Sequence, residues 1–347
     1  MPESIRMDEQ DLALVDALQL QPRAPWTDLG RVLGVNASTV ARRWERLSSS
    51  GLAWMAAYPQ PADFLTARVE VRCAAGTAPL LAEALADEPW IYSIDLISGS
   101  YEMLLSVAAP DAPSLVERVS TRVGRSPHVR RTSTSFVLRI YRESHQWLAH
   151  ALGQEQMRTL RAGRPPASRR PDVRPDAQLG ELLDADPRAS VAELSERTGL
   201  SASTVRRRLK ALEAGSAFSI RCDIAQAAAG WPVIALLKAQ VPPAHLNSVA
   251  REVAALPGVR TCYSVTGRAN LAIQLWLHTQ EQILEAEAEL DAAFEQLTIL
   301  DRTVVHWSYK RLGRVLEPSG VVRGKVPLAL GEAIVGDRTA DRPTTGG

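Results

Sequence analysis

The feature that most constrains this fold is a stretch of sequence that occurs twice. Residues 36–47 read NASTVARRWERL, and residues 201–212 read SASTVRRRLKAL. In both copies apolar residues recur at positions i, i+4 and i+7, which places them on one stripe of a helix and leaves polar and basic residues opposite. The offset of 165 residues also carries Pro22-Arg23-Ala24 onto Pro187-Arg188-Ala189. The repeated unit is therefore longer than the helix.

Further along the chain the offset becomes 168 residues. Repeats of the solenoid type have periods of about 20–50 residues, so two units of this length predict a duplicated two-domain protein. We read the chain as a first unit, a linker, a second unit and a tail. The equivalences at the new offset are Pro89 with Pro257, Gly99 with Gly267, and Tyr141 with Tyr309.

Each unit opens with three predicted helices and a tight corner before the third. Gly34 and Gly199 allow the chain to turn there, as in a helix-turn-helix. We expect Asn36 and Ser201 to cap the third helix, because their side-chain oxygens can accept a backbone N–H of its first turn. The predicted helices are residues 8–20, 26–33 and from 37 in the first unit, and residues 176–185, 190–198 and from 202 in the second. In the second unit Ser190 and Glu193 add a capping box.

After Gly51 the hydrophobic period changes to two. Val69, Val71 and Cys73 fall on one face, and Arg68, Glu70 and Arg72 fall on the other, as expected for a sheet with one face in water. Strands and helices then follow in the order β-α-β-β-α-β, which is the ferredoxin-like arrangement. The expected elements are residues 67–73, 79–87, 91–97, 101–107, 111–123 and 129–141, and in the second unit 233–241, 246–255, 259–265, 271–277, 282–297 and 299–310.

The predicted fold class is α+β, with two winged-type helix-turn-helix domains alternating with two ferredoxin-like domains. The segment from Gly163 to Pro175 is rich in Pro and Arg and predicts a solvated linker. Gly336 to Gly347 lacks periodicity and is expected to be disordered. We place the domains at residues 1–58 (helix-turn-helix), 62–143 (sensor), 144–175 (linker), 176–222 (helix-turn-helix), 230–313 (sensor) and 314–347 (tail).

Composition narrows the function classes. A net charge of +1 gives no global signature of a polyanion partner, so any nucleic-acid binding must come from local clusters. Cys73, Cys222 and Cys262 are isolated, which predicts buried thiols in a reducing compartment and no zinc site. The start has no signal peptide and no apolar run could cross a bilayer, so we expect a cytoplasmic protein. No nucleophile elbow, phosphate loop or metal-binding histidine spacing is present, so we expect no catalytic residues and no cofactor.

These segments resemble the leucine-responsive regulatory protein/AsnC (Lrp/AsnC) family of transcription regulators. The resemblance rests on MDEQDLALVDAL, LGRVLGVNASTVARRWERL and LISGSYEMLLSV in the first unit, and on AELSERTGLSASTVRRRLKALEAG and SVTGRANLAIQLW in the second. Members usually carry one such unit and assemble through the sensor domain. This chain therefore resembles a fused tandem form, whose two sensors could pair within one chain and could form higher homo-oligomers.

The resemblance implies that the third helix of each head enters the major groove of double-stranded DNA. Serine and threonine at its start and arginine along it would meet phosphates and base edges. The alternative is that these arginines are ordinary surface charges. The implied DNA-binding residues are Ser38, Thr39, Arg42 and Arg43 in the first head, and Ser203, Thr204, Arg206, Arg207 and Lys210 in the second. Linker arginines could add phosphate affinity or only solubility.

The family places a small effector, often an amino acid, by the turn before the third sensor strand. By position the implied effector residues are Gly99, Ser100, Tyr101 and Glu102, and Gly267, Arg268 and Asn270 in the second unit. Many members have an Asp in this loop and neither copy does. The alternative is that both glycines simply permit a hairpin turn. Tyr141 and Tyr309 are expected to pack in a core or an interface.

Two rival functions remain open, and the two heads are not expected to be equal. Sirohaem decarboxylases resemble the same architecture, and an assembly protein whose heads no longer touch DNA is a third possibility. Ala41 and Glu45 occupy the positions of Arg206 and Lys210, so we expect the second head to supply most of the DNA affinity. Alternatively, Glu45 reads a cytosine and makes the first head the selective one.

Overall fold

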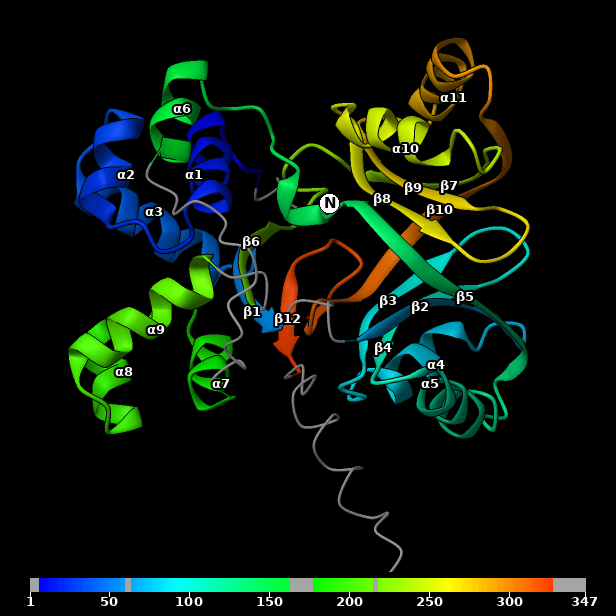
Figure 1. The fold of residues 1–347 in the computed structure, drawn as a ribbon, viewed down its shortest axis with the longest axis horizontal. Helices are drawn as coiled ribbons and strands as arrows, with labels where there is room; N and C mark the ends of the chain where they lie inside the picture. The colour runs from blue at the N-terminus through cyan, green and yellow to red at the C-terminus, as the bar shows by residue number, and fades with distance from the viewer. Residues whose placement is uncertain (1–5, 60–63, 163–176, 215–217, 327–347) are drawn as a thin grey trace, which may run out of the picture.

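The structure is a computed structural model that describes residues 6–59, 64–162, 177–214 and 218–326. Two groups of helices lie on one side of the molecule, and a large sheet with its own helices lies on the other (Figure 1). Within the described ranges, no helix is both long enough and apolar enough to cross a membrane.

Each head is a bundle of three helices followed by one strand. The left-handed backbone at Gly34 and Gly199, both at φ 69°, makes the predicted corner. The Ser190–Glu193 capping box and the Ser201 cap are confirmed, whereas Asn36 makes no side-chain cap bond. The first head is α1 (Glu9–Leu20), α2 (Trp26–Leu33), α3 (Ala37–Ser49) and β1 (Ala53–Pro59); the second is α7 (Ala177–Ala185), α8 (Val191–Thr198), α9 (Ala202–Ala214) and β6 (Phe218–Ile224).

The strands β1 and β6 were not predicted from the sequence, and they join the two heads. They form a two-stranded antiparallel ribbon in which Ala56 lies opposite Arg221. These two residues are themselves 165 positions apart, so the local twofold relation between the heads passes through this pair. Strand β1 reads AWMAAYP and does not alternate between apolar and polar residues, whereas β6 reads FSIRCDI and does, so a local strand signal was present for β6.

The two remaining strand and helix sets have the predicted order β-α-β-β-α-β. Their strand orders are β3-β4-β2-β5 and β8-β9-β7-β10, so the first strand of each set is central. The first set is β2 (Leu65–Cys73), α4 (Ala78–Leu85), β3 (Ile91–Ile97), β4 (Met103–Ala109), α5 (Ala112–Arg118) with a π-helical turn (Val119–Val123), and β5 (Val129–Arg142). The second is β7 (Val233–Gln240), α10 (Leu246–Ala255), β8 (Val259–Val265), β9 (Leu271–Leu277), α11 (Gln282–Ala293) and β10 (Thr298–Arg311).

The two sets join edge to edge within the chain. Strand β5 pairs with β8, and β10 pairs with both β3 and β7, so the eight strands close on themselves. The contacts are reciprocal: Ser98 N donates to Val304 O at 2.9 Å, and Thr266 N donates to Phe136 O at 2.9 Å. Helices α4 and α5 lie at one end of this assembly and α10 and α11 at the other (Figure 1).

The linker prediction for residues 144–175 is wrong for its first part. A 3-10 turn (Ser144–Gln146) and helix α6 (Gln154–Ala162) follow β5 directly, and α6 contacts α1 and α2. Asp16 of α1 accepts the backbone N–H groups of Ala149 and Ala151 at 2.7 and 2.9 Å, which fixes the connection to the first head. The Pro- and Arg-rich stretch 163–175 lies outside the described residues.

The tail prediction for residues 314–347 is also wrong at its start. Strands β11 (Arg314–Leu316) and β12 (Val322–Lys325) extend the sheet beyond β10. Val322 N donates to Gly51 O at 3.1 Å, so this extension also touches the first head. The sequence lacks a strong strand period here, and tertiary pairing supplies the order. Residues 336–347 lie outside the described part.

The face of β2 that was expected to be wet is an interior face. Arg68 and Glu70 point between the two joined sheets and line cavities there, while Arg72 at the strand end is exposed. A sheet face covered by a second sheet can hold charges when partners meet them, and Lys238 of β7 pairs with Glu70. The alternation was predicted correctly, but its environment was not.

Candidate nucleic-acid interface and ligand cavity

The third helix of each head buries its apolar stripe and exposes its polar side. Val40 and Leu47 in α3, and Val205 and Leu209 in α9, are at most 6% exposed. This geometry leaves the opposite face of each helix open to a nucleic-acid partner. Ser38 and Arg42 are exposed on α3; Ser203, Arg206, Arg207 and Lys210 are exposed on α9; Thr39 and Thr204 are half-buried.

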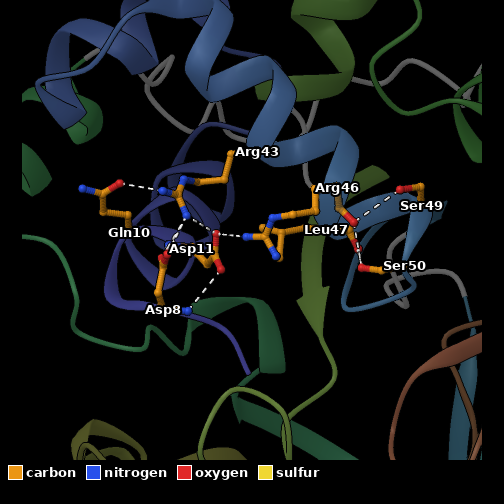
Figure 2. Close-up of polar contacts among 8 residues, drawn as sticks. All are labelled: Asp8, Gln10, Asp11, Arg43, Arg46, Leu47, Ser49 and Ser50. Atoms are coloured by element: carbon orange, nitrogen blue, oxygen red, sulfur yellow. Dashed lines mark hydrogen bonds and ion pairs between the residues drawn. The ribbon is translucent and has the colours of Figure 1, made fainter. Parts of the chain in front are cut away.

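Arg43 is directed elsewhere. Its guanidinium donates to Asp8 at 2.8 Å, to Asp11 at 2.6 Å and to Gln10 at 2.7 Å, all at the start of α1 (Figure 2). Hydrogen bonding to Asp11 raises the pKa of Arg43, and its side chain is 23% exposed. Asp8 and Asp11 also form the capping box of α1. Arg43 therefore ties α3 to α1, a structural role that its spacing on the helix did not predict.

The two heads hold each other through a reciprocal pair of arginines. Arg23 donates to the carbonyls of Pro187 and Ala189 at 2.6 and 2.8 Å. Arg188 donates to the carbonyls of Pro22 and Ala24 at 2.5 and 2.7 Å. The repeated Pro-Arg-Ala tripeptide is thus an interface between heads. One difference breaks the symmetry: the Arg188 guanidinium lies 3.7 Å from the ring centre of Trp26.

The turns before β4 and β9 are built mainly to close the sheets. Gly99 and Gly267 have φ values of 102° and 118°, which favour glycine. The Glu102 carboxylate accepts the backbone N–H of Cys73 at 2.7 Å. Asn270 is bonded through both amide atoms to the backbone of Val241, at 2.7 and 3.0 Å. Glu102 and Asn270 therefore bind the end of the neighbouring strand.

One of the two turns lines a cavity between the sheets. Gly267 and Arg268 face it together with Glu70, Lys238 and Asp301. Ser100, Tyr101 and the other expected residues of the first turn are absent from its lining among the described residues. Burial lowers the pKa of Lys238, but Glu70 and Asp301 outweigh that effect and raise it overall. Arg68 also lines this cavity, so its lining carries the cations Arg68, Lys238 and Arg268 against the carboxylates Glu70 and Asp301.

A second cavity, of about 180 Å³, lies at the end of the closed sheet that faces the heads. Its lining comes from strands of both halves and from β6 of the second head. Aromatic rings of Tyr92, Tyr263 and Trp276 form part of the wall. Five arginines converge on it, against the carboxylates Asp95 and Glu143; the arginines are Arg68, Arg142, Arg221, Arg260 and Arg311. We call this space the arginine cavity.

The arginines of this cavity are held to different degrees. Arg260 forms a buried ion pair with Asp223 at 2.7 Å, and Arg221 pairs with Glu143 at 2.9 Å. Burial lowers the pKa of Arg221 to about 9 and that of Arg260 to about 10, so their charges are held at a free-energy cost. Burial also raises the pKa of Asp95, which weakens its value as a counter-ion.

Of the five arginines, Arg68 is held by the weakest polar contacts. Its side chain donates to the hydroxyl of Ser106, and within the described ranges no carboxylate lies within ion-pair distance of it. Its buried Nε has no hydrogen-bond partner in that part of the chain. The guanidinium carbon lies 5.6 Å from the ring centre of Tyr263. Burial opposes the charge of Arg68, but Tyr263, Tyr92, Asp95 and Glu70 outweigh that effect and raise its pKa, so Arg68 stays charged beside the cavity without a direct ion pair to the described residues.

Comparison with known families identifies the architecture. The model of the AsnC-type helix-turn-helix domain matches residues 7–48 and again residues 176–213, and that of the Lrp/AsnC ligand binding domain matches residues 66–147. An uncharacterised HTH-type transcriptional regulator of Pyrococcus abyssi is 30% identical over 142 residues, which are 40% of this chain and 90% of that protein. The chain belongs to the Lrp/AsnC family. Its two helix-turn-helix segments identify a tandem form, as predicted.

Solved structures resemble this Lrp/AsnC chain over nearly its whole length. A crystal structure of the siroheme decarboxylase NirDL covers 95% of this chain and 99% of its own, with 15% identity and a TM-score of 0.56. A second structure of NirDL, in co-complex with an iron-uroporphyrin III analogue, covers 88% and 93%, with 15% identity and a TM-score of 0.55. At this identity the likeness establishes the fold.

The arginine cavity was missed from the sequence. Its arginines lie up to 243 positions apart, from Arg68 to Arg311, and no local motif joins them. The one signal in the sequence that pointed to this cavity was the position of Arg68, which alternates with buried valines on a central strand. The three cysteines are free and buried, as predicted, and no group of three potential metal ligands occurs in the described part.

Proposed function

We propose that this chain is a sequence-specific DNA-binding regulator of the Lrp/AsnC type, with α3 and α9 as its two recognition helices. The observation that carries the proposal is that both AsnC-type helix-turn-helix segments keep a polar, exposed face on the third helix. Exposed Ser38 and Arg42, and Ser203, Arg206, Arg207 and Lys210, are the proposed contacts with phosphates and base edges. Thr39 and Thr204 complete the set.

The head interface supports binding as one unit. The Arg23 and Arg188 bonds and the β1–β6 ribbon fix the two recognition helices relative to each other before DNA is met. Preorganisation of this kind lowers the entropy lost on binding. We therefore propose that one chain reads two adjacent half-sites, as a dimer of single-unit family members would.

The tandem arrangement extends to the sheet domains. We propose that the second β-α-β-β-α-β set is a second sensor domain, at residues 230–313, paired with the first at 62–143. The matching strand orders and the edge pairings between β5 and β8 and between β10 and β3 support this proposal. Further association of chains into homo-oligomers, with a small effector, is proposed by analogy with the family.

The test is footprinting of the full chain on genomic DNA. We expect discrete protected sites, and we expect the double variant Arg206→Ala/Arg207→Ala to lose at least tenfold in affinity for them. Arg302→Ala is the matched control, because Arg302 lies on β10 in an ion pair with Glu287, away from both heads. Protection that is uniform along DNA, or unchanged in the double variant, would refute the proposal.

A second candidate function is binding of a carboxylate-rich tetrapyrrole, by likeness to NirDL. The arginine cavity favours it, because guanidinium groups bind carboxylates well. The fit to an iron porphyrin is incomplete. Among the residues that the structure describes, no His, Cys or Met lines the cavity, and burial raises the pKa of Tyr92 to about 12, so that phenol stays protonated. An absorbance titration with iron-uroporphyrin III tests this candidate, and a spectrum equal to the sum of the free components would exclude it.

A further inference from the structure

We propose that the arginine cavity binds a small organic carboxylate with a single-ring or similarly compact apolar body, and that Arg68 is its main anchor. The site is distinct from the turns at Gly99 and Gly267, which the sequence had suggested for an effector. Three properties of the cavity lead to this assignment: its charge, its size and its wall.

The charge of the cavity depends on which cations remain unmatched. Arg260 is neutralised by Asp223, and Arg221 by Glu143. Arg142 donates to two backbone carbonyls, and Arg311 shares the Asp223 carboxylate with Arg260, at 3.9 Å, besides donating to a carbonyl and an amide. Arg68 donates to a hydroxyl and lies over the Tyr263 ring. Five arginines thus share Asp95, Glu143 and Asp223, which leaves an excess of positive charge around the cavity. Buried cations without counter-ions are strongly unfavourable, and an anion in the cavity removes that penalty.

The size and wall select the ligand within the class of anions. A cavity of about 180 Å³ is close to the roughly 150 Å³ that admits benzene in an engineered apolar site. Tyr92, Tyr263 and Trp276 give it aromatic surface. A bare inorganic anion would leave this surface unfilled, and the cavity would enclose only part of a tetrapyrrole. An amino-acid ammonium group would face a surplus of arginines.

Among the described residues of the two heads, Arg221 of the second head lines the cavity. Arg221 belongs to β6, which follows the recognition helix α9 along the chain. The equivalent position on β1 is Ala56, which cannot reach the cavity. A carboxylate that competes with Glu143 for Arg221 would therefore act first on β6 and α9, and on α3 only through the β1–β6 ribbon. This regulatory link rests on the proposed function; binding itself does not.

Calorimetric titration of the full chain with phthalate, an aromatic dicarboxylate, tests the site. We expect saturable binding that is absent for phthalamide, its neutral counterpart. Arg68→Met should weaken it at least tenfold, and Arg68→Lys should weaken it less. Arg72→Met is the matched control, because Arg72 lies on the same strand but is exposed and outside the lining; its affinity should stay within twofold.

Thermal unfolding separates an anchor from a structural arginine. Without phthalate, Arg68→Met should unfold close to the temperature of the parent chain, because the variant loses one hydrogen bond to a hydroxyl and no direct ion pair among the described residues, while the burial cost of the charge is also removed. It should also lose the stabilisation that phthalate gives the parent. A lower unfolding temperature with phthalate binding intact would overturn the assignment. Failure of phthalate to bind, including the case in which only uroporphyrin III binds, would equally overturn it.

A separate measurement tests the regulatory link between the arginine cavity and the affinity for DNA. Phthalate should change the affinity of the full chain for its footprinted site, and Arg221→Lys should reduce that change without abolishing phthalate binding. Binding of phthalate with no response in DNA affinity would overturn the link and leave the site. Absence of any DNA binding would refute the proposed function, while the calorimetric result on the protein alone would still stand.

Discussion

The contacts that join the two halves of this chain are largely the same in both halves, whereas the residues at the proposed ligand and DNA sites differ between them. Lys310 donates to the carbonyls of Ala86 and Glu88 at 2.7 and 2.9 Å. Arg142, its equivalent 168 residues earlier, donates to the carbonyls of Ala254 and Leu256, both at 2.7 Å. Each half thus sends a cation to the end of the other half's first helix, where the helix dipole favours positive charge.

The two halves also differ in sequence at the local symmetry axis that relates them, as well as on the surface. Glu70 and Lys238 are equivalent positions, 168 residues apart, and they form an ion pair with each other. In a true homodimer the two positions would carry the same charge and repel. Fusion of two units into one chain therefore permits a complementary pair that a symmetric dimer cannot have.

The largest expected effect comes from restoring symmetry at this pair. Glu70→Lys places two ammonium groups together in a largely buried site, and we expect the free energy of unfolding to fall by about 3–5 kcal/mol. Urea unfolding measures it. The double variant Glu70→Lys/Lys238→Glu should regain most of the loss. If the double variant is as unstable as the single one, the pair does not couple the halves.

A pH titration should distinguish Lys310 from Arg142. Burial lowers the pKa of Lys310 to about 8 from 10.5, so the folded protein binds this proton more weakly than the unfolded chain does. The free energy of unfolding should therefore rise as pH increases from about 8 to 10.5, by on the order of 2 kcal/mol. Lys310→Arg should lack this component, as Arg142 already does. Identical pH profiles for the two proteins would contradict the assignment.

The reciprocal contacts of Arg23 and Arg188 between the heads should contribute unequally to stability, despite their symmetry. Arg188→Ala and Arg23→Ala each remove two charge-assisted hydrogen bonds, for which we expect a loss of about 2 kcal/mol. Arg188 also stacks on Trp26, which should add about 0.5–1 kcal/mol to its effect. Thermal unfolding of the two variants measures the difference. Equal losses would show that the stacking contributes nothing.

The smallest expected effect concerns the DNA contacts of single arginines. Arg207→Ala should weaken operator binding more than Arg42→Ala, and each lost phosphate contact should reduce the salt slope by about 0.9. The gain-of-contact variant Glu45→Lys, which gives the first head the cation that Lys210 provides in the second, should raise the affinity and slope of the first head. If Arg42→Ala is as harmful as Arg207→Ala in both measures, the second head does not dominate. If Glu45→Lys instead relaxes base preference, Glu45 reads cytosine.

Most of the regular structure could be predicted, because residues close together in the sequence determine it. Strand β8 and helix α10 have the predicted bounds, and the capping box at Ser190 forms as expected. The errors concern segments whose order comes from distant partners. Helix α6 depends on α1 and Asp16, and β12 depends on β11 and the backbone of Gly51. Their own sequences carry little periodic signal.

The candidate site residues likewise divide into those that local sequence predicts and those whose contacts come from distant segments. The exposed serines and arginines of α3 and α9 follow from helical spacing, since the buried stripe leaves only one side free. Arg43 could not be distinguished from Arg42 by spacing alone, because the carboxylates that accept hydrogen bonds from Arg43 lie at the start of α1. Glu102 and Asn270 were expected at an effector site, and their true partners are backbone groups of a neighbouring strand.

By itself the sequence determined the duplication, the helix-turn-helix corners and the order of strands, because hydrophobic period, glycine and caps act within a few residues of one another. Only the tertiary structure decided that the Arg68 face is enclosed, that equivalent positions meet as Glu70 and Lys238, and that five arginines share one cavity. Those outcomes depend on surfaces brought together from segments more than a hundred residues apart. Burial and charge pairing exist only once the sheets have closed.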